Sequence, residues 1–278
     1  RNNDLPGVML AASFEKYIQR YDVVPDNNPV IFTNNSSTFS LLKLLIDRNR
    51  MPKAYVDVRD IKKIERDTLD LLEAHNIPFY PKSEVEGCDG NNEIKKISLR
   101  TKKNKIIKIE ASMLCISGGI NPDIHLFTQS KGLVKWDEKI VTFKPEKSFQ
   151  KTITLGSVSG NFIFNKIIDE VNQKLNFIDG VNDVDLKIEV NGSKEFNIKE
   201  IWETKNNNKS LWSKSFIDLQ NDVTTKDLTQ AIREGFDRIE HLKRFTTNSM
   251  GTDQGKISSI NALGIVSKLL KKSVSEVG

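Results

Sequence analysis

The chain has few of the residues that mark several classes of protein. Its 278 residues include only two cysteines and three histidines. Two cysteines exclude a disulfide-rich scaffold and any four-cysteine metal or cluster site within the chain, and such usage is typical of a reducing compartment. No apolar run approaches the roughly 20 residues that span a bilayer. The composition therefore predicts a cytoplasmic protein with no membrane segment.

Motifs for nucleophilic or metal catalysis are also missing. There is no G-x-S-x-G or H-E-x-x-H stretch, and His75, His125 and His241 have no metal-ligand spacing. Cys115 lies inside an apolar run, where a small core residue is the expected role. The sequence thus predicts no catalytic residue and no metal ligand in this chain.

The charges nearly balance, with 42 Lys and Arg against 37 Asp and Glu. The resulting net charge of +5 is weak evidence for an anionic partner. A lysine cluster lacks the interleaved aromatic residues that nucleic-acid binding uses, so we interpret it as a solvated face: Lys95, Lys96, Lys102, Lys103 and Lys105. We therefore expect no nucleic-acid partner.

Length and composition indicate about two globular domains. Hydrophobic residues make up 37% of the chain and charged residues 28%, which allows a buried core and excludes wholesale disorder. The first residue is Arg1 and not Met. We expect the chain to be a piece of a longer polypeptide.

The first part of the chain has a β-α-β pattern that is typical of a parallel sheet. Short apolar runs at 30–33, 54–58 and 77–80 predict strands, and the runs between them at 41–46 and 61–72 predict helices. Asp57 follows its strand as a ribose-binding carboxylate would. The turn at 34–37 has no glycine, however, and its side chains would crowd a pyrophosphate. We therefore favour a scaffold role for this unit over a second nucleotide site.

Two later apolar runs lead into turns of small residues. Strands are predicted at 113–117, before Gly118 and Gly119, and at 152–155, before Gly156, with a helix over 162–175. Glycine lets a ligand approach the backbone, and free N–H groups at a helix start favour a phosphate. The alternative is a tight turn with no ligand, because such turns recur in every α/β protein.

The remaining segments complete the expected elements. The pattern predicts a β-hairpin from strands at 94–101 and 105–110, and one strand near 186–190. Apolar residues at helical spacing from Leu228 to Leu242 predict one helix with a threonine cap, and 257–270 predicts another. Residues 1–20 combine a Pro-Gly turn with a helical pattern through Met9 to Ile18.

Several segments together resemble one family, the alpha subunits of heterotetrameric sarcosine oxidases. The strongest is "FIDLQNDVTTKDLTQAIREGFDRIEHLKRFTTNSMGTDQGK" at 216–256, and the others are "RNNDLPGVMLA" at 1–11, "IFTNNSST" at 31–38, "VDVRD" at 56–60 and "SGGINPDIHLFTQSKG" at 117–132. The resemblance implies an α/β, two-dinucleotide-domain (glutathione-reductase-like) flavoprotein fold with a β-meander and a small C-terminal helical domain.

The resemblance also implies a division into domains. Residues 1–24 and 107–180 would form an NAD-binding, FAD-like domain that lacks its N-terminal part. Residues 25–106 would be an inserted Rossmann-like domain with the hairpin, 181–210 a connecting segment, and 211–278 the helical domain. The first glycine-rich motif would lie before Arg1, and a folate-binding domain would lie after Gly278.

The function implied by the resemblance belongs to a complex. Beta, gamma and delta subunits would be partners of this chain, which would bind NAD while the beta subunit holds FAD and FMN. The complex would oxidise sarcosine with oxygen to glycine and hydrogen peroxide and pass the one-carbon unit to tetrahydrofolate. The residues expected to contact NAD are Gly118, Gly119, Gly156, Ser157, Phe162 and Phe164. The alternatives are an FAD-dependent amino-acid or opine dehydrogenase subunit and a non-catalytic interaction module.

The helical domain resembles one that holds an iron–sulfur cluster in relatives. At the positions of the cluster cysteines this sequence has Asp218, Gln220, Asp253 and Ser258. A cluster needs thiolate ligands. We therefore expect no cluster here, and a domain kept for packing or subunit contacts.

Overall fold

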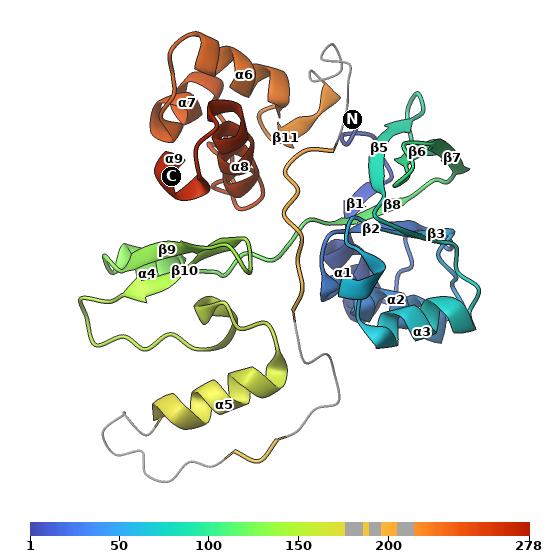
Figure 1. Cartoon of the computed structure of the whole chain (residues 1–278), viewed down its shortest axis with the longest axis horizontal. Coiled ribbons are helices and arrows are strands. Elements are labelled where there is room, and N and C mark those ends of the chain that lie inside the picture. Colours follow the sequence, from blue (N-terminus) through green and yellow to red (C-terminus); the bar gives the residue numbers. More distant parts are fainter. Residues whose placement is uncertain (176–185, 189–195, 205–213) are drawn as a thin grey trace. The chain divides into compact units, whose positions relative to one another are not determined.

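A computed structural model describes residues 1–175, 186–188, 196–204 and 214–278 (Figure 1). The chain divides into two compact units, one made of residues 1–118 and 199–278 and the other of residues 119–198. None of the helices in the described ranges is both long and apolar enough to cross a membrane.

The first unit is built on a five-stranded parallel sheet in the order β1-β8-β2-β3-β4. Three central strands are rich in apolar residues, as expected where both faces of a sheet are covered. The predicted division assigns β1 and β8 to the NAD-binding domain, and in this sheet β1 pairs with β8 while β8 also pairs with β2 of the predicted inserted domain. The strands are β1 (Val8–Leu10), β2 (Val30–Thr33), β3 (Ala54–Asp57), β4 (Phe79–Pro81) and β8 (Leu114–Ser117).

Three amphipathic helices cover one face of this sheet (Figure 1). Side chains alternate between the two faces of a strand, so Ile31 and Tyr55 point to the helices while Val30 and Val56 point to the other face. The helices bury their apolar sides against the first set. They are α1 (Ala11–Tyr21), α2 (Phe39–Asp47) and α3 (Arg66–Ala74).

A three-stranded antiparallel sheet packs on the opposite face through a second apolar cluster. Its buried residues include Val85, Ile97 and Leu99 on the antiparallel sheet and Val30 and Val56 on the parallel one. The strands are β5 (Glu84–Asp89), β6 (Lys96–Arg100) and β7 (Ile106–Glu110). The predicted hairpin is therefore two of the three strands of this layer.

The C-terminal part of the first unit is a small helical domain with its own apolar core. Its first helix begins at a capping box in which the Thr224 N–H donates to the Asp227 carboxylate. Leu228 and Leu242, both fully buried, lie at the centre of this core. The elements are β11 (Phe216–Asp218), β12 (Val223–Thr224), α6 (Thr225–Arg233), α7 (Ile239–Thr246), α8 (Ser258–Leu270) and α9 (Val274–Val277).

The described residues of the second unit form a β-hairpin and two helices. Trp136 and Phe143 meet edge to face across the hairpin, with their ring centroids 5.2 Å apart. Phe127 is buried under Gly132, where any side chain would collide with its ring. The elements are α4 (His125–Gln129), β9 (Leu133–Asp137), β10 (Thr142–Lys147), a 3₁₀ turn (Gly156–Ser159) and α5 (Phe164–Leu175).

Several sequence expectations need correction. Residues 152–155 are extended but form no strand, because the described residues offer them no neighbouring strand. The single helix predicted through Leu242 is two helices, since Gly235 adopts φ 93° and ends α6. Met9 belongs to β1 and not to the first helix. The strand predicted near 186–190 lies partly outside the described residues, and its residues 186–188 are irregular.

The packing of α2 against the sheet can be tested with Leu45→Ala. Leu45 is completely buried, so truncation should lower the free energy of unfolding by about 2–5 kcal/mol. Leu126→Ala is the matched control, since Leu126 is 88% exposed and its truncation should be nearly neutral. Urea denaturation of both variants measures the difference. A neutral Leu45→Ala would mean that this face of the sheet is not a packed core.

Candidate functional site

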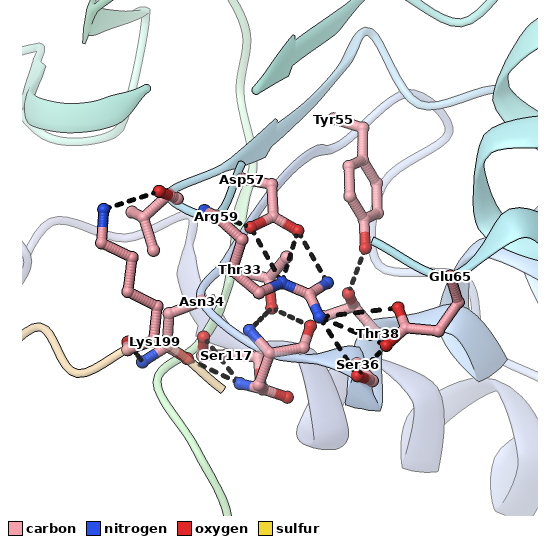
Figure 2. Close-up of polar contacts among 12 residues, drawn as sticks. Thr33, Asn34, Ser36, Thr38, Tyr55, Asp57, Arg59, Glu65, Ser117 and Lys199 are labelled. Atoms are coloured by element: carbon pink, nitrogen blue, oxygen red, sulfur yellow. Dashed lines mark hydrogen bonds and ion pairs between the residues drawn. The ribbon is translucent and has the colours of Figure 1, made fainter. Parts of the chain in front are cut away.

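The carboxyl edge of the parallel sheet is where α/β proteins place their ligands. Strands β2, β3 and β8 end side by side at Thr33, Asp57 and Ser117. Parallel pairing therefore brings three polar residues, far apart in sequence, to one edge. Figure 2 shows that the polar side chains following these strands converge there on one network.

A buried ion pair lies at the centre of the network. The Arg59 guanidinium donates from Nη2 to Asp57 Oδ2 at 2.8 Å and from Nε to Oδ1 at 3.1 Å, and the Arg59 backbone N–H donates to Oδ1 at 2.8 Å. The side chains are 2% and 0% exposed. Burial raises the pKa of the Asp57 carboxyl, and the hydrogen bonds and charge of Arg59 oppose that rise. Both side chains are thus excluded from solvent, and removing either one would leave the other as an uncompensated buried charge.

A second carboxylate occupies the other side of the guanidinium. Arg59 Nη1 lies 3.1 Å from Ser36 Oγ and 3.4 Å from Glu65 Oε1, and Ser36 Oγ donates to Glu65 at 2.5 Å. On the inner side of the network, the Tyr55 hydroxyl lies 2.7 Å from Thr38 Oγ1. Burial raises the pKa of this tyrosine, so it stays neutral.

The turn after β2 holds neighbouring chain segments together. Asn34 Nδ2 donates to the carbonyl oxygens of Gly118 and Lys199, and the Lys199 N–H donates back to the Asn34 carbonyl. Asn35 Oδ1 accepts the Ser37 N–H, as an N-cap residue does. Lys199 Nζ also donates to the Val58 carbonyl, as Figure 2 shows. The polar side chains of this turn are therefore already in use.

This edge does not suit a dinucleotide phosphate. The Arg59 guanidinium is already paired with the carboxylates of Asp57 and Glu65, so it is not available to bind a phosphate. The turn also lacks the glycines that let a pyrophosphate approach the backbone. The geometry agrees with the scaffold interpretation of this β-α-β unit. Arg59 and Glu65 were missed by the sequence reasoning; an arginine two residues after a strand-end aspartate was the available signal.

Gly118 and Gly119 follow β8 and differ in what surrounds them. A side chain added at Gly118 would meet nothing within 4 Å, and the Gly118 carbonyl accepts a hydrogen bond from Asn34 Nδ2. Gly119 has φ 137°, a conformation that side chains disfavour. A side chain at Gly119 would lie 3.1 Å from Ile198 Cδ1, so of the two glycines Gly118 has the open space beside it.

Gly156 is enclosed by its own unit. Its N–H donates to Glu170 Oε2 at 3.0 Å, and Asn161 Nδ2 donates to the same oxygen at 2.7 Å. Lys174 pairs with Oε1 of this carboxylate at 2.5 Å. Burial opposes ionisation of Glu170, but these donors outweigh it and lower the pKa. The Gly156 N–H that could bind a phosphate thus donates to the Glu170 carboxylate instead. The sequence analysis did not identify Glu170, although its i,i+4 spacing from Lys174 was an available signal.

The other predicted NAD contacts of this unit, Ser157, Phe162 and Phe164, have different surroundings from Gly156 and from one another. Ser157 is exposed, and Phe164 is 48% exposed at the start of α5. Phe162 packs on Phe196, with ring centroids 5.0 Å apart. Gly118 belongs to the first unit and the other five predicted residues to the second, each described by itself.

The four residues at the expected cluster positions form polar contacts in pairs. Asp218 accepts the N–H groups of Ser249 and Gln220 at 2.7 and 2.9 Å, and Ser258 Oγ lies 3.4 Å from it. Gln220 Oε1 accepts the Asp253 N–H at 3.4 Å. Burial would raise the pKa of Asp218, but the backbone donors prevail and lower it. A carboxylate with its own N–H donors therefore organises this corner.

Arg59→Met tests the buried pair. Removing the guanidinium leaves Asp57 buried without a cation, so we expect the free energy of unfolding to fall by about 3–5 kcal/mol in urea denaturation. The double variant Asp57→Leu, Arg59→Met removes both charges and should lose less than the single variant. An additive or larger loss in the double variant would show that the two groups are not coupled.

Asp218→Asn tests the helical domain. The loss of a charged acceptor should cost about 1–3 kcal/mol at pH 7. Because the folded pKa of Asp218 is lowered, its contribution is present above the ordinary aspartate pKa and is lost as the pH falls through the lowered one. Stability of the variant, followed from pH 6 to 2, should therefore fall less than that of the parent chain. Asp222→Asn, at an exposed neighbour, is the control and should leave the profile unchanged.

Curated sarcosine oxidase alpha subunits are similar to this chain over nearly its whole length. The sarcosine oxidase alpha subunit of Rhizobium meliloti (strain 1021) is 30% identical over 99% of this chain and 27% of its own length. The sarcosine oxidase alpha subunit of Corynebacterium sp. (strain U-96) is 24% identical over 97% of this chain and 29% of its own length. The chain thus spans less than a third of these curated relatives.

The fold comparison agrees with the predicted class. The crystal structure of L-proline dehydrogenase from P. horikoshii covers 100% of this chain and 51% of its own, with a TM-score of 0.61 and 19% identity. The predicted α/β flavoprotein-like fold is confirmed. Residues 212–278 match the model of the sarcosine oxidase A3 domain. Along nearly its whole length, the chain is similar to sarcosine oxidase alpha subunits.

Proposed function

We propose that this chain is the central part of a sarcosine oxidase alpha subunit. The complete complex would oxidise sarcosine to glycine, reduce oxygen to hydrogen peroxide and transfer the one-carbon unit to tetrahydrofolate. The observation that carries the proposal is the similarity to named alpha subunits over 97–99% of the chain. Beta, gamma and delta subunits would be the partners in the cytoplasm, with FAD and FMN in the beta subunit.

Within that complex this chain would act as a scaffold that binds a nucleotide. Cys88 and Cys115 are buried, and burial raises the thiol pKa of Cys88 to about 11, which makes a poor nucleophile at neutral pH. No group of three or more histidine, cysteine or acidic residues in the described ranges could hold a metal ion. These features support a division in which the oxidation takes place in a partner subunit.

NAD is the proposed nucleotide, and Gly118 and Gly119 are its best-supported contacts. The open backbone at Gly118 fits a ligand, whereas the carboxyl edge of the sheet and the Gly156 N–H are already occupied by Glu65 and Glu170. Ser157, Phe162 and Phe164 remain proposed contacts from the second unit. NAD would be held and oriented here with no redox step assigned to it.

The released nucleotide tests the proposal. The complete complex is purified, denatured and analysed by mass spectrometry, and we expect about one NAD per alpha subunit. Gly118→Val places a side chain in open space, so it should leave the melting temperature unchanged but reduce bound NAD at least about tenfold, a loss of roughly 1.4 kcal/mol. Asn92→Val, in an exposed loop, is the control.

Other results would contradict this assignment. If the Gly118→Val variant binds as much NAD as the parent protein, Gly118 and Gly119 are not NAD contacts. A flavin released from the alpha subunit in place of NAD would favour the FAD-dependent dehydrogenase alternative, and no nucleotide at all would favour an interaction module.

A further inference from the structure

The β6–β7 hairpin of the first unit carries the excess positive charge of the chain. Residues 94–110 contain seven lysines and arginines and one acidic residue, Glu110. The whole chain has a net charge of +5, so the residues outside this hairpin are together close to neutral. The charge is therefore concentrated on one antiparallel hairpin and is not spread over the molecule.

The strands of this hairpin send apolar and basic side chains to opposite faces. Ile97 of β6 is buried in the second apolar cluster, and Ile109 of β7 pairs with it and packs against the same cluster. Because side chains alternate along a strand, the basic residues of the two strands lie on the other face. They are Lys96, Arg100 and Lys108.

The turn between the two strands adds three more lysines. The Thr101 N–H donates to the Lys105 carbonyl at 2.9 Å, and the Asn104 N–H donates to the Thr101 carbonyl at 2.8 Å. Asn104 has φ 58°, a conformation that asparagine tolerates. Lys102, Lys103 and Lys105 are exposed, as expected for a solvated face. Three ammonium groups thus extend from a hydrogen-bonded turn.

Ion pairs neutralise only part of this charge. Arg100 pairs with Glu86 at 2.7 Å, and Lys96 pairs with Glu110 at 3.7 Å. The other lysines of the hairpin have no ion pair with any residue that the structure describes: Lys95, Lys102, Lys103, Lys105 and Lys108. The repulsion among these ammonium groups is therefore not relieved within the described part of the chain.

Protection of a strand edge accounts for only one of these lysines. Among the described strands, β7 is an edge of the sheet β5-β6-β7, and a lysine within an edge strand discourages pairing with another strand. Lys108 lies within β7, whereas the turn lysines precede it, at positions where no strand edge is present. A cluster of one sign instead attracts a surface of the opposite sign.

The chemistry of the hairpin favours an acidic protein surface over other anionic partners. Proteins that bind single-stranded nucleic acid stack the bases on aromatic side chains, and residues 94–110 contain no aromatic residue. An element that binds at a membrane surface inserts large apolar side chains beside its basic ones. Within residues 94–110, all of which are described, Ile106 is the one exposed large apolar residue, at 40%.

We propose that the β6–β7 hairpin docks, through Lys102, Lys103, Lys105 and Lys108, on an acidic face of another subunit of the complex. The inference rests on the proposed function, because it needs an alpha subunit that assembles with other subunits. Complementary charges across such an interface raise the rate of association and fix the orientation of the partners. The attraction should weaken as salt is added.

Charge reversal in the turn tests the proposal in the full-length alpha subunit. The triple variant Lys102→Glu, Lys103→Glu, Lys105→Glu changes only exposed side chains, so its melting temperature should equal that of the parent. Its affinity for the other subunits, measured by titration at about 50 mM salt, should be at least about tenfold weaker. At about 500 mM salt the two affinities should converge, because salt screens the interaction.

A second triple variant is the matched control. Lys16→Glu, Lys43→Glu, Lys63→Glu makes the same change in net charge at exposed positions elsewhere in the first unit. Its affinity should stay within about twofold of the parent, because the proposal depends on where the charge lies. Equal losses in the two variants would assign the effect to net charge alone and would overturn the proposal.

Three further outcomes are decisive. A hairpin variant that assembles as tightly as the parent would overturn the docking surface and leave the proposed function intact. Binding of the parent to vesicles of phosphatidylserine and phosphatidylcholine, lost in the hairpin variant while assembly is unchanged, would overturn it in favour of a membrane surface. A parent alpha subunit that assembles with no other subunit would contradict the proposed function and, with it, this surface.

Discussion

A carboxylate buried at the end of a central strand needs a cation beside it, and Arg59 supplies that cation to Asp57. Because both side chains are almost fully buried, neither can be removed without leaving the other uncompensated. The pair fixes the chain after β3 against the turn after β2 through Ser36 and Glu65. The polar contacts at the carboxyl edge of the first sheet are centred on this pair.

The ion pair also explains where a ligand does not bind. The carboxyl edge of a parallel sheet is open to phosphates when its turns are rich in glycine and its charges are few. Here the turn is built from asparagine and serine side chains that bond to one another and to neighbouring segments. This β-α-β unit therefore keeps the architecture of a nucleotide site and uses its interior for structure.

The helical domain also contains a carboxylate that is held by nearby hydrogen-bond donors. Asp218 occupies a position where the resemblance places a cluster cysteine, and backbone N–H groups converge on its carboxylate. A carboxylate with several N–H donors stabilises a corner that thiolates and a metal cluster would otherwise organise. Asp218 thus organises this corner of the domain that matches the A3 model.

The sequence predicted the elements that have strong local signals. The central strands at Val30 and Ala54 and the helix at Ser258 lie close to where their apolar patterns place them. Strand β1 and the pairing of β8 with β2 could not be predicted, because they depend on contacts between segments about 80 to 100 residues apart. Residues 152–155 have a strand pattern but no strand, since a strand also needs a neighbour.

The candidate site was predictable only in part. Asp57 and Gly118 stand at strand ends that the sequence marks, whereas the roles of Arg59 and Glu170 come from tertiary contacts that no local pattern fixes. The glycines of the two turns also look alike in sequence. Only the structure separates the open backbone at Gly118 from the enclosed N–H of Gly156.

The central claim is that the protein's own side chains close the carboxyl edge of the first sheet, so that the proposed nucleotide would lie against Gly118 instead. An experimental structure of the complete complex with its nucleotide tests this most directly. The account predicts nucleotide density along the Gly118–Gly119 backbone and an intact contact between Arg59 and Asp57. Nucleotide phosphate density between the Asn34–Ser37 turn and Arg59, with the ion pair opened, would contradict it.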